Sequence, residues 1–86
     1  MAKQKTAKVL EYTAVFEPAE EGGYVVTVPS LPGCVTEGDT FEEAVEMIKD
    51  AISGYLEVQK EMGEEIPEEH KGVVVTRISV PQPQTV

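Results

Sequence analysis

The 86-residue chain contains no tryptophan and a single cysteine, Cys34. One cysteine cannot form an intrachain disulfide, which favours a reducing cytoplasm as the location. No stretch approaches the roughly 20 apolar residues that a membrane span requires. The basic residues within positions 1–8 precede no apolar run, so we expect a flexible basic tail there and neither a secretory signal nor a membrane anchor.

Positive charge is also scarce, because 7 basic residues stand against 16 acidic ones, for a formal net charge of −9. Lys3, Lys5 and Lys8 supply three of the basic residues. From Val9 onward, four basic and 16 acidic residues remain, a charge of −12. Such a surface repels phosphate, so we expect no nucleic-acid binding by this chain and a basic protein as the favoured partner.

Alternating apolar residues predict strands. Between residues 9 and 17 every second side chain is apolar, which places Leu10, Tyr12, Ala14 and Phe16 on a core-facing side. The Gly22-Gly23 pair predicts a hairpin into a second strand, residues 24–28. Residues 34–37 read as a brief third strand, and residues 73–80 as a last strand that is apolar on both faces.

A helix is predicted between the third and fourth strands. Thr40 and Glu43 have the spacing of a capping box, and Gly63 is the expected stop signal. The apolar stripe between them recurs every three or four residues. Its members are Phe41, Ala44, Val45, Ile48, Ala51, Ile52, Tyr55, Leu56 and Met62.

The resulting β-β-β-α-β order predicts one α+β domain over residues 9–80, followed by a flexible tail at residues 81–86. A right-handed crossover gives a four-stranded sheet of order 3-2-1-4, with the last strand parallel to the first. One helix covers one face only. The other face would carry Val9, Val15, Val73 and Val75, from which we predict a homo-oligomer, either dimer or tetramer. The alternative for any one of these valines is simple exposure, because exposed valines are common in sheets and need no partner.

The sequence offers little support for a catalytic or metal site. Cys34 could act as a nucleophile only with an activating base, and nothing in the sequence links it to His70, which falls in an acidic loop. We therefore expect Cys34 to be a small buried core residue. The acids of residues 64–69 lack the spacing of a calcium or zinc site. Within the strands only Glu11 and Glu17 could serve a nuclease. We therefore expect no enzyme activity, metal or cofactor.

The stretch GYVVTVPSLPGCVTEGDTFEEA, residues 23–44, resembles the signature of the HicB family of antitoxins. The likeness continues through the helix into residues 63–67 and covers about residues 9–80. It implies a partial ribonuclease-H-like fold without the catalytic carboxylates, in an oligomer. It also implies a partner, a small basic HicA toxin with a double-stranded-RNA-binding-like fold. That toxin is an mRNA interferase whose active-site histidine the antitoxin masks.

The signature residues have a mechanical interpretation as well. They stiffen a loop, permit its bend and start the helix, so we expect them to preserve the fold: Pro29, Pro32, Gly33, Thr40 and Glu43. Many HicB proteins carry a carboxy-terminal DNA-binding domain, whereas this chain ends soon after Val80. We expect no direct nucleic-acid binding by this chain, and whether any DNA binding occurs without such a domain stays open.

Three functions remain open. The first is neutralisation of a HicA-type toxin through acidic contacts, for which we predict Glu17, Glu20, Glu21, Glu42, Glu46 and Asp50. For each of these acids the alternative is a merely solubilising role. The second is a homo-oligomeric structural or regulatory module without a toxin. The third is a residual nuclease that uses Glu11 or Glu17.

Overall fold

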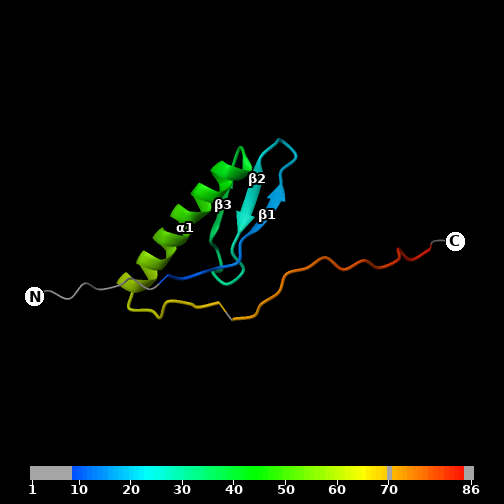
Figure 1. The fold of residues 1–86 in the computed structure, drawn as a ribbon. Helices are drawn as coiled ribbons and strands as arrows, with labels where there is room; N and C mark the ends of the chain where they lie inside the picture. Colours follow the sequence, from blue (N-terminus) through cyan, green and yellow to red (C-terminus); the bar gives the residue numbers. More distant parts are fainter. Residues whose placement is uncertain (1–8, 70, 85–86) are drawn as a thin grey trace, which may run out of the picture.

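The computed structural model describes residues 9–69 and 71–84, so the predicted basic tail at residues 1–8 lies outside the described residues. The elements are β1 (Val15–Pro18), β2 (Tyr24–Thr27), β3 (Val35–Gly38) and α1 (Phe41–Glu61). The strands form an antiparallel sheet of order β1-β2-β3, and α1 lies along it (Figure 1). The α+β class is confirmed.

The predicted fourth strand is wrong for this structure. Residues 73–80 form no strand, and the described chain from residue 71 to 84, here called the C-terminal arm, runs away from the sheet (Figure 1). The sheet order 3-2-1-4 is therefore replaced by three consecutive antiparallel strands. A valine-rich pattern shows that a segment can pair, but a strand forms only where its backbone finds an edge. The ribonuclease-H-like likeness stays a prediction.

The first strand is shorter than predicted. It was expected over residues 9–17, but its ladder with β2 starts at Val15, which lies opposite Thr27, the last residue of β2. Residues before 15 consequently have no strand residue opposite them in that ladder. The predicted facing holds for Tyr12, Ala14 and Phe16, which pack against the core, whereas Leu10 lines a pocket instead.

The core lies between β2, the loop that follows it, and the first half of α1. Val26 and Leu31 are completely buried, and Ala44 and Ile48 meet them from the helix. Cys34 is buried beside them, and desolvation raises the pKa of its thiol. The predicted core role of Cys34 is thus confirmed.

An aromatic cluster closes the core at the hairpin end. The ring centroids of Phe16 and Phe41 lie 4.8 Å apart, and Tyr24 packs edge-on against both rings at 6.0–6.4 Å. This geometry is favourable for aromatic rings and joins β1, β2 and the start of α1.

The start of α1 follows its sequence signals. Thr40 accepts a hydrogen bond from the Glu43 backbone N–H at 3.0 Å, and the Glu43 carboxylate accepts one from the Asp39 N–H at 3.0 Å. Gly38 lets the helix approach β3, because a Cβ there would lie 2.5 Å from the Ala44 nitrogen. At the other end Gly63, with φ +72°, follows the C-cap Met62, as predicted.

Candidate functional site: an acidic pocket and an uncovered sheet face

The sheet face away from α1 is uncovered and mixes valines with acids. Residues in register on neighbouring strands point to the same face. One row across the sheet is Val15, Thr27 and Val35, and the next row is Glu17, Val25 and Glu37. Val26 lies between these rows and is buried toward the helix, so both rows point the other way. The uncovered face therefore carries three valines with a carboxylate at each edge.

Only one of the four predicted interface valines lies on this face. Val15 is there, whereas Val9 precedes β1 with 84% of its side chain exposed. Val73 and Val75 lie on the C-terminal arm, outside the sheet. Sequence reasoning missed Val25 and Val35. The available signal was the alternation within β2, since a core-facing Val26 sends Val25 to the opposite face.

An acidic pocket of about 420 Å³ lies where the β1–β2 hairpin meets the connection from β3 to α1. The hairpin brings Glu21, the end of β3 brings Glu37 and Asp39, and the first helical turn brings Glu43. Met47 adds an apolar side chain that is 44% exposed. Four acidic residues from the hairpin, the end of β3 and α1 thus line one pocket beside Met47, and such a lining suits a basic partner with an apolar contact.

The six predicted contact acids divide into two groups by element. Glu17, Glu20 and Glu21 belong to β1 and its hairpin, and Glu42, Glu46 and Asp50 belong to α1. Glu21 lines the acidic pocket; Glu20 adjoins it in the hairpin, and Glu17 lies on the uncovered face opposite Val25. Glu42 belongs to the first turn of α1, while Glu46 and Asp50 are exposed farther along the helix and do not line the pocket. Glu46 forms an exposed ion pair with Lys49 at 3.4 Å. Sequence reasoning missed Glu37 and Asp39, because only the fold brings β3 beside the hairpin.

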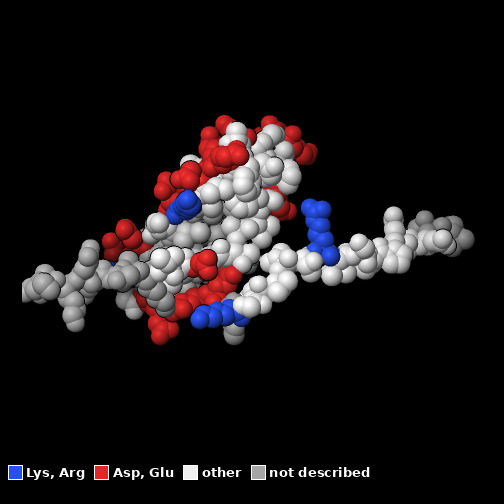
Figure 2. Space-filling view, viewed as in Figure 1, with Lys and Arg blue, Asp and Glu red and all other residues white. Residues whose placement is uncertain are grey.

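Charge separates the described chain into two parts. Residues 9–69 hold all 16 acidic residues but only Lys49 and Lys60 among the basic ones, a formal charge of −14. Figure 2 shows acidic side chains over the helix and the hairpin end. The C-terminal arm contains Lys71 and Arg77 and no acid.

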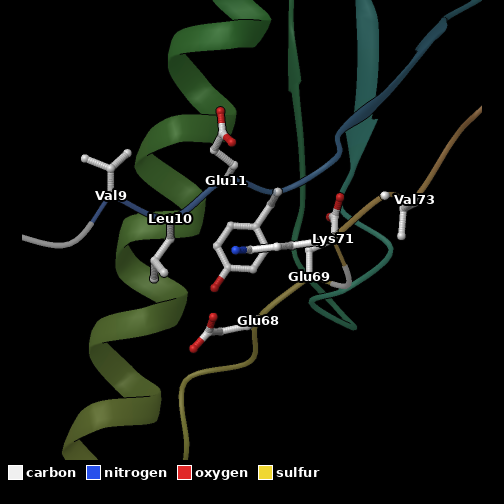
Figure 3. Close-up of a pocket in the computed structure, with 9 residues that line it drawn as sticks. Val9, Leu10, Glu11, Glu68, Glu69, Lys71 and Val73 are labelled. Atoms are coloured by element: carbon white, nitrogen blue, oxygen red, sulfur yellow. The ribbon is translucent and has the colours of Figure 1, made fainter.

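A second pocket, of about 500 Å³, is lined by residues 9–12 on one side and by residues 68, 69 and 71–73 on the other (Figure 3). Glu69 anchors this region: its Oε1 accepts hydrogen bonds from the Thr13 backbone N–H at 2.6 Å and from the Ser30 hydroxyl at 3.2 Å. Its other oxygen accepts the Thr13 hydroxyl. These bonds, led by the Thr13 hydroxyl, hold the pKa of Glu69 below its usual value. The Tyr12 hydroxyl donates to the Pro67 carbonyl.

The side chains considered for catalysis are not brought together in the described chain. Glu11 lines the pocket beside Glu69, but Glu17 lies at the far end of β1 and does not line it. Across residues 9–69 and 71–84, no three His, Cys, Asp or Glu side chains are close enough to hold a metal ion. His70 lies outside the described residues. No helix in the same ranges is long and apolar enough to cross a membrane.

Comparison with known proteins decides the family. Residues 12–81 match the family described as the HicB_like antitoxin of bacterial toxin-antitoxin systems. The chain belongs to this family. The resemblance seen in residues 23–44 is thereby confirmed, and both the acidic pocket and the uncovered face lie within the matched residues.

Among the relatives of this HicB-like chain, the match covers most of one and less than half of two others. It is 46% identical over 61 residues to the UPF0150 protein Ta0767 of Thermoplasma acidophilum, covering 71% of this chain and 88% of that protein. It is 47% identical over 60 residues to Antitoxin HicB 1 of Photorhabdus laumondii, a match that covers 70% of this chain and 39% of that protein. It is 38% identical over 58 residues to Antitoxin HicB of Escherichia coli K12, a match that covers 67% of this chain and 42% of that protein. The match thus spans less than half of either named antitoxin.

Proposed function

We propose that this chain acts as an antitoxin that binds and neutralises a small basic HicA-type mRNA interferase. Family membership and the relatives named antitoxin support the general role. The observation that carries the proposal is the acidic pocket, whose lining includes Glu21, Glu37, Asp39 and Glu43 together with Met47. Carboxylates placed this way attract a basic surface, accelerate encounter and penalise acidic competitors.

The proposed contact surface comprises the pocket and the acids beside it. Glu17 and Glu20 extend it along the hairpin, and Glu42 extends it onto the first helical turn. Glu46 and Asp50 would contact only a partner large enough to lie along α1. Binding through such a surface masks the toxin sterically and requires no chemistry from the antitoxin, so we propose a non-enzymatic role.

The test is mRNA cleavage by the HicA-type protein encoded in the source genome, measured with and without this chain. We expect a stoichiometric excess of the chain to abolish cleavage and the complex to weaken as salt concentration rises. Failure of inhibition at low salt, or a genome without such a gene, would contradict the proposal and favour the toxin-free module.

A matched pair of double variants locates the surface. Glu21→Lys with Glu37→Lys should weaken toxin binding by on the order of a hundredfold, since close charge pairs across interfaces couple by about 1.5 kcal/mol or more. Glu57→Lys with Glu61→Lys changes the net charge equally at the other end of α1, where both side chains are exposed. Equal weakening by the two pairs would show that net charge, rather than the pocket, governs binding.

We also propose that the chain forms a homo-oligomer. Val15, Val25 and Val35 leave an apolar strip on the uncovered sheet face, and the C-terminal arm exposes further valines. Apolar surface of this kind is typical of protein contacts. Analytical ultracentrifugation of the purified chain across a wide concentration range checks the proposal, and a persistent monomer would exclude it.

A further inference from the structure

The C-terminal arm is the least buried apolar segment among the described residues. Val73, Val74, Val75, Ile78 and Val80 have exposed fractions between 52% and 81%. No ladder pairs them. The rest of the described chain, residues 9–69 and here called the body, buries residues of the same kind in β2. Unpaired backbone and exposed valines on an extended segment are what a strand presents before it joins a sheet.

The sheet offers an edge for such a strand. In the described chain, β1 pairs with β2 on one side and has no strand on its other side. The segment that leads into β1 widens this edge, and its residues 9–12 already line a pocket together with Lys71, Gly72 and Val73 (Figure 3). At the opposite edge, β3 is the strand against which the start of α1 packs, at Gly38.

The arm fits the β1 edge in charge and in side-chain order. Glu11 and Glu17 are six residues apart, as are Lys71 and Arg77. Whether the arm runs parallel or antiparallel, one register therefore pairs both basic residues with both acids. In both directions that register puts Val74 opposite Ala14, which packs against the core. It also sets Val73 and Val75 beside Val15 and Thr13, on the same side as the uncovered face.

The arm does not fit the edge of its own chain equally well. Glu69 is held at Thr13 by two hydrogen bonds. If the arm continued from there along its own β1, residue 74 would reach Pro18, the last residue of that strand. Val75, Ile78 and Val80 would then extend beyond the sheet. The arm of a second copy is not tied to this β1 through its own Glu69, so it can meet the edge in a different register.

From these observations we infer that the arm of one copy adds as a fourth strand to the β1 edge of a second copy, and that the second copy returns its arm in the same way. The exchange joins two chains through backbone hydrogen bonds and places Val74 of each arm against the core side of the partner's sheet. The sheet then has four strands, as the sequence predicts, with the fourth supplied by the partner. The inference rests on the proposed homo-oligomer and is independent of the proposed toxin binding, because self-association is measured without toxin.

A mixed sample tests the exchange directly. One copy carries a nitroxide on Ser79→Cys at natural isotope abundance, and the other is wild-type chain labelled with nitrogen-15. Cys34 is buried and does not compete for the label. We expect amide signals of residues 9–17 in the nitrogen-15 copy to lose most of their intensity. Ser53→Cys, on an exposed position of α1, is the control label and should spare those signals in the other copy.

Two results would overturn the inference. Loss of the β1 signals only when label and nitrogen-15 are on the same chain would show that the arm closes onto its own sheet. Unchanged β1 signals in both samples would show that the arm does not pair with β1.

Variants of exposed residues test the same inference without disturbing the body. Val74→Lys should raise the dimer dissociation constant at least about tenfold, because it places a charge where a valine would be buried. Val58→Lys is the control, with a valine on α1 that is 53% exposed, and should change the constant less than about twofold. Equal effects of the two variants would contradict the exchange.

Charge reversal gives the strand direction. Glu17→Lys should weaken the dimer, and a second change should restore it: Arg77→Glu if the strands are parallel, Lys71→Glu if they are antiparallel. Restoration by one of them supports the exchange and identifies its register. Restoration by neither would show that Glu17 does not face the arm.

Discussion

The body and the C-terminal arm use similar residues with opposite results. β2 and the arm are both rich in valine, yet Val26 of β2 is completely buried and Val74 of the arm is 81% exposed. β2 has a strand on each side and a helix over one face, whereas the arm has neither. Apolar pattern alone therefore specifies the capacity to form a strand, and neighbours decide whether the strand forms.

The largest expected effect is the loss of stability when a buried side chain of the body is truncated, compared with an exposed side chain of the arm. Leu31→Ala should reduce the free energy of unfolding by about 2–5 kcal/mol, because Leu31 is fully buried in the core. Ile78→Ala, in the arm, should change it by less than about 0.5 kcal/mol in the monomer. Urea denaturation at concentrations below dimer formation measures both. A large loss from Ile78→Ala in dilute monomer would show that the arm packs on its own body.

The next effect concerns close backbone approach within the body. Gly38→Ala should destabilise the chain by about 1–3 kcal/mol, since its Cβ would lie 2.5 Å from the Ala44 nitrogen. Gly54→Ala is the matched control: nothing lies within 4 Å of its Cβ, and alanine should stabilise the helix by about 1 kcal/mol. Thermal unfolding should thus shift in opposite directions, and a shift of the same sign would refute the close helix–sheet contact.

A smaller loss is expected at the helix start. Thr40→Ala removes the hydroxyl that accepts the Glu43 N–H and should lower the free energy of unfolding by about 1 kcal/mol. Thr40→Ser keeps the acceptor and serves as the control. Equal losses in chemical denaturation would mean that the cap contributes nothing.

The smallest effect lies at the junction of body and arm. The pKa of Glu69 is lowered from about 4.5, so its ionised form favours the folded contact. That contribution is present above the ordinary pKa and is lost as pH falls through the lowered value. Thr13→Val removes the hydroxyl donor and should raise the pKa of Glu69 toward its usual value. Carbon-13 NMR of the carboxyl group measures the titration, and an unchanged pKa would exclude the Thr13 contact.

Much of the body could be predicted because its signals are local. The Thr40–Glu43 cap, the apolar stripe of α1 and the Gly22-Gly23 turn depend on residues only a few positions apart. The acidic pocket could be predicted only in part. Glu21 belongs to a turn that the sequence reveals, but Glu37 and Asp39 join it through strand register, which connects residues distant along the chain.

The sequence by itself determined the α+β class, the helix bounds and the acidic character of the body, since composition and short-range periodicity carry that information. The family followed from the resemblance of residues 23–44 to its signature. Tertiary structure alone decided that β1 begins at Val15, that Val25 and Val35 share a face with Val15, and that residues 73–80 stay outside the sheet. The physical reason is that a strand needs hydrogen-bond partners from another segment. Which segments meet depends on the packing of the whole chain.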